Sequence, residues 1–320
     1  MTVQGTILTV TVNPALDLTT SVHKLLPRAK LRCSAAQYDP GGGGVNVSRV
    51  IHELGGKSSA FIAVGGSTGE HLARLLEARG VSADRWPIDG ETRTSFTVME
   101  GETGEHYRFV LPGPVQPASR IDGLMDAVAA SMLADCAYVV LSGSLMPGLP
   151  RDSYARLITL ARSRGAKVLL DAHGIELKLA LPARPDILRL NHLEADELVG
   201  DGRSNQSAIQ LCQQLLVQGV AETVLVSHAE DGTAAGNRDG CFVVRPPRVQ
   251  VRSTVGAGDS LVGAFVLGLA RGWPIVDAVR YGVAAAAAAV TAEGADLCDR
   301  QTTERFLAET VTTDHSVATA

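Results

Sequence analysis

The stretch Ser253–Gly272 reads STVGAGDSLVGAFVLGLARG and places two glycines and an acid directly before an apolar helix. From residue 261 to residue 270 every position is apolar or glycine, so the predicted helix has no wide polar face and is expected to be buried. Arg271 and Gly272 are typical of a helix C-terminus, because a cation suits the negative end of the helix dipole and glycine suits the position after the last turn. A carboxylate at the start of a buried helix needs a structural or a chemical reason.

Two interpretations of Asp259 compete. In the first, the aspartate caps the helix, a role worth about 1 kcal/mol. In the second, Gly256, Ala257 and Gly258 offer free backbone N–H groups to an anion at the positive end of the dipole, and Asp259 acts as a base beside it. The stretch alone leaves both open.

Composition excludes several classes of function. The chain has 320 residues, enough for one or two domains, and its 45% hydrophobic, 4% aromatic and 20% charged residues are typical of a globular protein. A net charge of −5 without a basic run argues against nucleic acid as the main partner. No apolar stretch reaches the roughly 18 to 20 residues of a membrane span, and the N-terminus lacks the pattern of a signal peptide, so we expect no membrane partner.

The cysteines and histidines favour a reduced, cytoplasmic location without a zinc site. The five cysteines are scattered and odd in number, without CxxC spacing, which suits small buried side chains in a reducing compartment (Cys33, Cys136, Cys212, Cys241 and Cys298). The eight histidines form no HxxxH or HExxH pattern.

Short apolar runs alternate with helical patterns along the chain. The predicted strands are Thr6–Val12, Ser59–Val64, Tyr138–Leu141, Lys167–Asp171, Ile187–Leu190 and Thr223–Ser227. The predicted helices, besides the opening one, are Val45–Leu54, Gly69–Arg79, Ile121–Ala134, Asp152–Arg164, Ser207–Gln218 and Pro274–Thr291. This alternation predicts one α/β domain over residues 1–320, a mainly parallel sheet with helices on both faces.

Two segments break the alternation, Asp17–Gln37 and Thr92–Leu111. Both alternate apolar with polar residues, as half-exposed antiparallel strands do. They predict a small antiparallel sheet inserted in the domain, which is a candidate lid and a candidate dimer surface because its apolar face needs cover. The tail over about 310–320 has little to bury and is expected to fray.

Three glycine-rich sites could hold a phosphate. Gly56-Lys57-Ser58 matches only the end of a Walker A loop, since Ile51 stands where the first glycine is needed, and GAGDSL lacks the third glycine of a dinucleotide fingerprint. In YDPGGGGVNVSRV, Tyr38–Val50, four glycines precede a helix and allow a ligand to approach backbone N–H groups, with Asn46 in the first turn. The alternative for this loop is a flexible connection.

GGGGxN and TVGAGDSLVGA, about 210 residues apart in an α/β chain, resemble the signatures of the ribokinase-like carbohydrate kinases. Further matching segments are NPALD, AKLRC, GGSTGEHL, YRFVLPG, LSGSLMPG and Asn191-x-x-Glu194, spread over essentially the whole chain. YDPGGGG and YRFVLPG narrow the resemblance to the phosphofructokinase-B branch, and within it to the minor-isozyme type of 6-phosphofructokinase. The resemblance implies a ribokinase-like fold with a small antiparallel β lid.

The resemblance implies that Asp259 is the catalytic base and that the backbone of Gly256, Ala257 and Gly258 forms the anion hole for the transferred phosphoryl group. Physical chemistry agrees with this assignment, because phosphoryl transfer depends on positioning and on charge stabilisation by fixed N–H dipoles. A buried helix is a rigid support for both.

On the acceptor side, the resemblance implies contacts to sugar hydroxyls and to the sugar phosphate. The hydroxyl contacts are Asp17, Gly42, Gly43 and Asn46, with Arg93 and Ser144 beside them. Three cations on the predicted lid suit the phosphate, with Lys30 acting across a dimer in which the lids pack together (Lys30, Arg32 and Arg108). A solvated lid face is the alternative for these cations.

On the donor side, the resemblance implies ATP and Mg²⁺. The nucleotide contacts are Asn191, Ser227, Gly232 and Thr254, with Gly256 and Gly258, and Glu194 holds Mg²⁺ through water. The chain departs from the family here. Arg189 and Leu193 replace two lysines, Ala229 replaces the first glycine of a Ser-x-Gly-x-x-Gly loop, and residues 284–289 are all alanine. The choice of donor, a potassium site and a second, inhibitory ATP site stay open.

These observations predict an ATP- and Mg²⁺-dependent kinase that phosphorylates the 1-hydroxyl of fructose 6-phosphate, and a homodimer formed through the lids. Tagatose-6-phosphate kinase and 1-phosphofructokinase are alternatives within the class, because the sequence does not separate epimers. A non-catalytic sugar-phosphate-binding paralogue is the alternative outside it, motivated by the altered donor loop.

Overall fold

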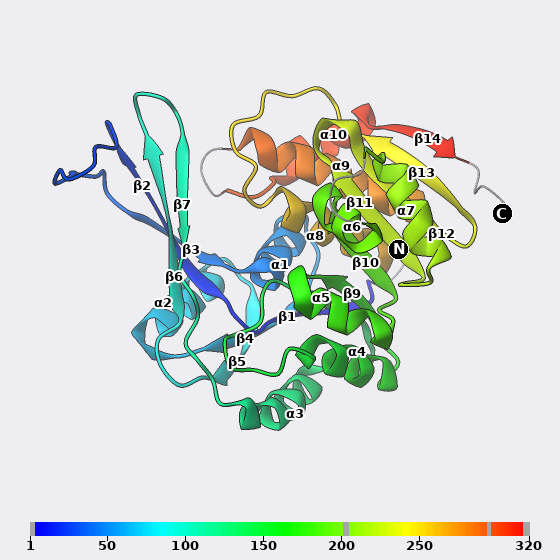
Figure 1. The fold of residues 1–320 in the computed structure, drawn as a ribbon, viewed down its shortest axis with the longest axis horizontal. Coiled ribbons are helices and arrows are strands. Elements are labelled where there is room, and N and C mark those ends of the chain that lie inside the picture. Colours follow the sequence, from blue (N-terminus) through cyan, green and yellow to red (C-terminus); the bar gives the residue numbers. More distant parts are fainter. Residues whose placement is uncertain (1–3, 201–204, 293–295, 316–320) are drawn as a thin grey trace.

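A computed structural model describes residues 4–200, 205–292 and 296–315. In this part of the chain a large sheet carries helices on both faces, and a small sheet stands beside it (Figure 1). None of the described helices is long and apolar enough to cross a membrane.

The large sheet has ten strands in the order β14-β13-β12-β11-β10-β9-β8-β1-β4-β5 within the described residues. Seven adjacent strands are parallel, namely β11 (Thr223–His228), β10 (Ile187–Asn191), β9 (Lys167–Asp171), β8 (Cys136–Ser142), β1 (Thr6–Thr11), β4 (Ser59–Val64) and β5 (Ser82–Pro87). The other three are antiparallel, β12 (Gly232–Asn237), β13 (Gly240–Arg245) and β14 (Val311–His315). All six predicted strands are confirmed to within two residues at each end.

Alternate residues of the parallel strands from β11 to β4 face opposite layers of helices, whereas the edge strand β5 is mostly exposed. Val168 and Leu170 of β9 pack toward one layer and Leu169 packs toward the other, as a strand covered on both faces requires. The first layer holds α3 (Ile121–Ser131), α4 (Ser153–Ser163), α5 (Gly174–Ala180), α6 (His192–Val199) and α7 (Ala208–Val217). The second holds α1 (Gly43–Glu53), α8 (Ala257–Ala270), α9 (Ile275–Thr291) and α10 (Arg300–Glu309), and α2 (Gly66–Ala78) packs beside α1 against β4.

The helix that the opening stretch predicts is α8, and it is buried as expected. Ten of its fourteen residues are buried, among them Phe265 and Leu267, which are fully inaccessible. Gly263 lies against Val50 of α1, where a Cβ atom would be 2.6 Å from Val50 Cγ1. The glycine therefore lets α1 approach α8 closely, which brings the N-terminal turns of both helices to the same edge of the large sheet.

The small sheet has the order β3-β2-β6-β7, with β2 at Ala15–Val22, β3 at Gln37–Gly41, β6 at Arg93–Glu100 and β7 at His106–Val110. The outer pairs are antiparallel, but β2 and β6 run parallel, so the sheet predicted as antiparallel is mixed. The reason is connectivity, since β2 and β6 are far apart in sequence and the chain crosses through the main body between them. Residues 23–36, which were predicted within the first lid segment, form an irregular connection between β2 and β3.

The fraying predicted for residues 310–320 is wrong for its first part. Residues 311–315 form β14, which pairs antiparallel with β13 in a register that puts Thr312 opposite Val244. Backbone hydrogen bonds to an open sheet edge need no apolar side chains, and threonine favours extended backbone, so a segment with little to bury can still be ordered. Residues 316–320 lie outside the described residues.

Candidate active site

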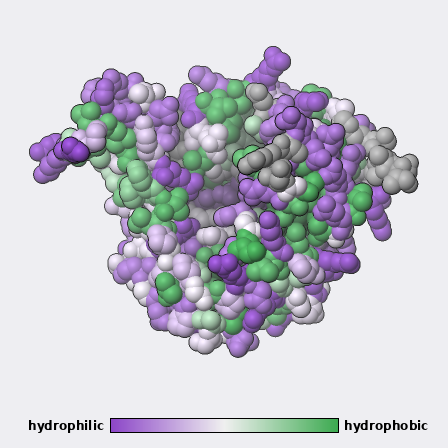
Figure 2. Space-filling view, viewed as in Figure 1, coloured by the Kyte–Doolittle hydropathy of each residue, from purple (hydrophilic) through white to green (hydrophobic). Residues whose placement is uncertain are grey.

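A polar cavity of about 390 Å³ lies between the small sheet and the carboxyl ends of the parallel strands. Figure 2 shows it as a hollow lined by hydrophilic residues near the middle of the view. The small sheet, the first glycine-rich loop, strands β8 to β10 and the start of α8 contribute to its wall, whereas Gly256, Ala257 and Gly258 are not among the lining residues. The lining residues are Ala15, Asp17, Gly42, Gly43, Asn46, Arg93, Ser95, Arg108, Val110, Ser142, Gly143, Ser144, Asp171, Ala172, His173, Arg189, Glu194 and Asp259.

The first glycine-rich loop lies flat against the main sheet because its residues lack side chains. Gly42 precedes α1 with a φ of 111°, in the left-handed region that favours glycine. A Cβ atom on Gly41 would overlap the Asp17 carboxylate, and one on Gly43 would overlap the Ser142 hydroxyl. The glycines therefore let the start of α1 reach the floor of the cavity with its backbone exposed.

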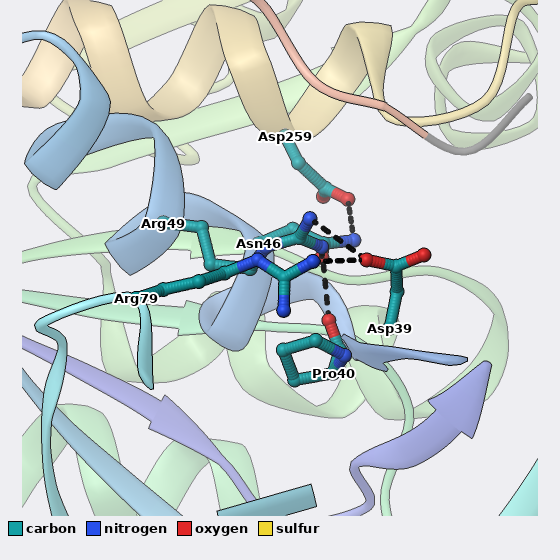
Figure 3. Close-up of polar contacts among 6 residues, drawn as sticks. All are labelled: Asp39, Pro40, Asn46, Arg49, Arg79 and Asp259. Carbon is teal, nitrogen blue, oxygen red and sulfur yellow. Dashed lines mark hydrogen bonds and ion pairs between the residues drawn. The ribbon is translucent and has the colours of Figure 1, made fainter. Parts of the chain in front are cut away.

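At the second glycine-rich loop, Asp259 does not cap α8. The residue before the helix is Gly256, with a φ of 75°, and no side chain accepts a hydrogen bond there. Asp259 lies one turn inside, where its Oδ2 atom accepts a 2.8 Å hydrogen bond from Asn46 Nδ2 (Figure 3). The capping interpretation is therefore wrong, and the two glycine-rich loops meet through this bond.

Burial raises the pKa of Asp259 toward the value that suits a general base at neutral pH. Desolvation, together with a smaller effect of the nearby Asp171 carboxylate, raises its pKa to about 6. The Asn46 amide, Arg189 and Arg108 act in the opposite direction. A carboxylate with this pKa is ionised above neutral pH and still basic enough to accept a proton from a hydroxyl.

On the acceptor side, the structure brings Asp17 and Arg108 to the same cavity. Asp17 Oδ1 is buried and has no hydrogen-bond partner, although its carboxylate opens on the cavity. Burial raises the pKa of Asp17, against the attraction of Arg108, Arg93 and Arg49. An unpartnered acceptor next to cations fits a ligand that brings both hydroxyl donors and a negative charge.

Arg93 and Ser144 line the cavity and are both hydrogen-bonded to Asn13, Arg93 to its carbonyl oxygen and Ser144 to its side-chain amide. Arg93 donates to Asn13 O from Nε at 3.2 Å and from Nη2 at 3.1 Å, and to Leu111 O from Nη1 at 3.3 Å. Ser144 Oγ accepts a 3.0 Å bond from Asn13 Nδ2. These contacts fix the wall, so Arg93 acts on a ligand partly through its charge.

Lys30 and Arg32 are the predicted substrate residues that the structure does not bring to the cavity. Both lie on the irregular connection between β2 and β3, where they are exposed to solvent. Their phosphate contacts, and the action of Lys30 across a dimer, stay predictions.

On the donor side, an ion pair faces the N-terminus of α8. Arg189 Nη1 lies 3.2 Å from Asp171 Oδ1, and Ser142 Oγ donates to Asp171 Oδ2 at 3.0 Å. A Cβ atom on Gly258 would be 3.0 Å from Arg189 Nη2, so the guanidinium lies against the glycine-rich turn. Arg189 Nε is buried without a partner. This guanidinium and the free N–H groups of the turn form a place for an anion.

Asn191 and Glu194 form a capping box at the start of α6. Asn191 Oδ1 accepts from Glu194 N at 2.9 Å, and Glu194 Oε2 accepts from Asn191 N at 2.8 Å. Glu194 lines the cavity whereas Asn191 does not, among the residues described. Burial raises the pKa of Glu194, with a smaller contribution from Asp171.

The carboxylates that face the cavity fit a hydrated Mg²⁺ ion and do not fit a metal ion bound by protein ligands alone. No group of three or more metal-ligating side chains occurs in the described ranges. Mg²⁺ typically keeps several waters and takes one or two carboxylates together with substrate phosphates. Glu194 and Asp171 can supply such carboxylates, since both face the cavity.

The remaining nucleotide candidates lie along the same sheet edge. Ser227 is the last residue but one of β11 and lies opposite Asn191 of β10, and Gly232 follows with a φ of 97°. Ala229 has a φ of 38°, a left-handed conformation that strains a residue with a side chain. Thr254 is exposed before the α8 turn. His192 and His228 stack at 4.1 Å between ring centroids beside this loop.

Sequence reasoning missed Asp171, His173, Ser142 and Ser95 among the lining residues. A signal was present for the first, because Asp171 ends the apolar run KVLLD, and polar residues at the carboxyl ends of parallel strands gather at one edge of a sheet. His173 follows two residues later.

The α/β fold, with a polar cavity that holds a partly buried carboxylate at the start of α8, defines the class of protein, and comparisons place it among known proteins. Residues 11–302 match the model of the pfkB family of carbohydrate kinases. The chain is 40% identical over 301 residues to ATP-dependent 6-phosphofructokinase isozyme 2 of Mycobacterium tuberculosis, covering 94% of this chain and 88% of the relative. It is 36% identical over 304 residues to the isozyme 2 of Escherichia coli (strain K12), covering 94% and 98%.

Solved structures agree. The phosphofructokinase-2 of Escherichia coli in complex with potassium superposes with a TM-score of 0.89 at 36% identity, covering 95% of this chain and 99% of that one. Its tetrameric inhibited form superposes with a TM-score of 0.88 at 35% identity and the same coverage. The chain therefore belongs to the pfkB family of carbohydrate kinases. The predicted fold and enzyme class are confirmed.

Proposed function

We propose that the protein is an ATP-dependent 6-phosphofructokinase that phosphorylates the 1-hydroxyl of fructose 6-phosphate. The observation that carries the proposal is that one cavity holds Asp259, whose pKa is raised to about 6, together with Asp17 and Arg108. This reaction needs a base, a group that accepts hydrogen bonds from the sugar hydroxyls, and a cation that binds the distant phosphate of the sugar. The names of the relatives support the choice of substrate.

In the proposed reaction, Asp17 and the backbone of Gly42 and Gly43 orient the sugar, and Arg108 holds its phosphate. The O1 hydroxyl gives its proton to Asp259 while oxygen forms a bond to the γ-phosphorus of ATP, and the bond from phosphorus to the bridging oxygen breaks to release ADP. The backbone N–H groups of Gly256 to Gly258 and the Arg189 guanidinium stabilise the charge on the transferred group. Glu194 and Asp171 would hold Mg²⁺, which supplies further neutralisation of the phosphates.

Asn191 serves the donor site mainly by holding Glu194. Because the two side chains bond each other's backbone, the capping box fixes the position of the Glu194 carboxylate at the cavity. Ser227, Gly232 and Thr254 stay proposed nucleotide contacts. A potassium requirement also stays a prediction.

A coupled assay of ADP release tests the proposal. The screen uses fructose 6-phosphate, tagatose 6-phosphate and fructose 1-phosphate, each with ATP and with GTP. We expect the highest kcat/KM with fructose 6-phosphate and ATP. A higher kcat/KM with one of the other sugars would replace the substrate with that alternative. Binding of sugar phosphate without ADP release from any of them would support the non-catalytic paralogue.

Replacing Ala229 by glycine is expected to lower the KM for ATP and to raise the melting temperature. Alanine at a φ of 38° costs roughly 1 kcal/mol relative to glycine, and this strain lies in the proposed donor loop. The KM for the sugar phosphate should not change, because the loop lies away from Asp17 and Arg108. Steady-state kinetics and thermal denaturation check the prediction, and an unchanged or higher KM for ATP would contradict it.

We propose that the outer face of the small sheet forms a homodimer interface. Tyr107, Phe109 and Leu111 alternate with cavity-facing residues and are 41%, 44% and 45% exposed. Phe109 stacks on Phe96 at 4.7 Å between ring centroids, which makes a flat apolar surface. Sedimentation equilibrium tests the dimer, and a monomer at micromolar concentration would exclude it.

A cytoplasmic location stays a prediction, and the five cysteines are free thiols.

A further inference from the structure

Arg49 does not line the cavity itself, yet it lies one turn along α1 from Asn46, which does. Its guanidinium is largely buried, with a side chain 10% exposed. Nη1 donates to Asn46 Oδ1 at 3.0 Å and to Pro40 O at 2.9 Å, immediately before the first glycine-rich loop (Figure 3). Arg49 is therefore connected both to the partner of the proposed base and to the backbone that leads into the loop.

An ion cluster with the buried Asp39 carboxylate at its centre holds Arg49 in this position. Arg49 Nη2 lies 3.7 Å from Asp39 Oδ1, and the same oxygen is paired with Arg79 at the end of α2. The Asp39 side chain is 8% exposed. The cluster thus ties β3, α1 and α2 together behind the glycine loop, as the close-up shows (Figure 3). A guanidinium anchored on three sides has little freedom to turn away from Asn46.

The contacts of Asn46 can be satisfied in only one orientation of its amide. A guanidinium has only donors, so the Asn46 oxygen must face Arg49. An ionised carboxylate has only acceptors, so the Asn46 nitrogen must face Asp259. Asparagine is nearly symmetric in shape, and without Arg49 only the ionised form of Asp259 holds the amide in this orientation, because a protonated carboxyl group can also donate to the amide oxygen.

We propose that Arg49 is a positioning residue that sets the amide orientation of Asn46 and thereby keeps Asp259 supplied with a hydrogen-bond donor. In this role Arg49 determines the ionisation of the base through one intervening side chain. The inference rests on the proposed role of Asp259 as the base and goes beyond the assignment of Asn46 to sugar hydroxyls.

The electrostatics of the site agree with an indirect action. The Asn46 hydrogen bond lowers the pKa of Asp259, whereas Arg49 is not among the charges that shift it. If the amide turned over, its oxygen would face the carboxylate and favour the protonated acid, which raises the pKa. The groups that act on Asp259 directly are Asp171, Arg189 and Arg108, and those that act on Arg49 are Arg79, Asp39, Asp17 and Asp296.

The sign of the expected pH effect follows. A base must be ionised to accept a proton, so kcat should rise as pH increases through the pKa of Asp259. Removing the guanidinium raises that pKa, so kcat should fall most at acid pH and approach the wild-type value at pH 8 to 9. A shift of one pKa unit changes the ionised fraction about tenfold well below the pKa. A variant that only disturbs folding would instead lose activity by a similar factor at every pH.

The test compares Arg49→Met with Arg79→Ala in the intact protein. Methionine fills similar volume without donors, and Asp39 keeps Arg79 as its partner, so no buried charge is left alone. Arg79→Ala removes a cation from the same cluster but leaves the Arg49–Asn46 bond. With saturating ATP and fructose 6-phosphate, Arg49→Met should lose roughly twofold to fivefold more kcat at pH 6 than at pH 8, because pH 6 lies at the pKa of Asp259. The substrate phosphate titrates in this range too, and the control shares that effect.

A double-mutant cycle shows whether Arg49 acts through Asn46. In an Asn46→Ala background, Arg49→Met should have almost no additional effect on the pH profile, because the amide is already absent. Equal effects in both backgrounds, or a profile of wild-type shape in the single variant, would overturn the proposal.

A second measurement does not depend on turnover. Carbon-13 NMR of aspartate carboxyl groups gives the pKa of Asp259, whose signal is identified by its absence in Asp259→Asn. We expect the pKa to rise by about half a unit to one unit in Arg49→Met, and by less in Arg49→Lys, which keeps one donor. If the methionine variant does not fold, the pKa of Asp259 in Arg49→Lys tests the proposal. An unchanged pKa rejects the positioning role, whereas a raised pKa in a protein without kinase activity supports it and rejects the proposed function instead.

Discussion

Replacing Asp259 by asparagine is expected to lower kcat roughly 10²- to 10⁴-fold, the usual contribution of a general base. Asparagine keeps the shape of the side chain but cannot take the proton of the substrate hydroxyl. Asp259 does not cap α8, so the substitution removes no helix cap. Kinetics with saturating fructose 6-phosphate and ATP measure the loss, and the KM values should change little because the polar contacts of the cavity remain.

The same substitution should leave the protein as stable as before or more stable. The folded state raises the pKa of Asp259 to about 6, so burying the ionised carboxylate opposes folding. This cost is absent below about pH 4, where the carboxyl group is protonated in both states, and is complete above about pH 6. At pH 8 asparagine removes the cost, on the order of 1 to 2 kcal/mol after allowing for water in the cavity. Thermal denaturation at pH 8 and pH 5 should therefore show a larger gain at pH 8.

Asp299→Asn is the matched control for this prediction. Asp299 caps α10 by accepting from Thr302 N at 2.8 Å, and it lies outside the cavity. Asparagine caps a helix as well as aspartate does, so both kcat and the melting temperature should stay near the wild-type values. An active but destabilised Asp259→Asn protein would show that the carboxylate is structural, and the kinase mechanism proposed here would be wrong.

The parts of the fold that the sequence predicts well are those decided by local patterns. Short continuous apolar runs such as KVLLD and SAFIAV are typical of strands covered on both faces, and β9 and β4 begin and end where predicted. β12 reads GTAAGN, which has neither alternation nor bulky β-formers. It becomes a strand because β11 and β13 offer backbone partners on both sides, and no local pattern carries that information.

The site divides in the same way. The glycines and Asp259 were identifiable because a motif and a helix terminus coincide in sequence. The bond from Asn46 to Asp259 joins residues 213 positions apart, and it exists only because α1 and α8 pack closely at Gly263. The spacing of Asn191 and Glu194 also predicts a capping box, which the sequence analysis did not infer. The structure forms that box at the start of α6.

Replacing Arg108 by alanine is expected to raise the KM for the sugar phosphate by roughly 10- to 100-fold, with a much smaller effect on kcat at pH 8. A charge-assisted hydrogen bond to a phosphate is worth about 1.5 to 3 kcal/mol, and this bond forms in the ground state as well as in the transition state. Arg108 lies on β7 at the cavity, opposite Thr97 of β6. Arg108→Lys should recover part of the loss, because lysine keeps the charge but not the planar fork.

The pH of the measurement separates two effects of the same cation. Arg108 also lowers the pKa of Asp17 and of Asp259, so its removal raises both. At pH 6 the variant should therefore lose kcat as well, whereas at pH 8 Asp259 is ionised with or without Arg108 and only the KM should respond. Arg156→Ala is the control, since Arg156 is an exposed arginine of α4 paired with Asp152. If the KM for fructose 6-phosphate is unchanged at pH 8, the small sheet does not hold the phosphate, and the assignment of Asp259 as the base is unaffected.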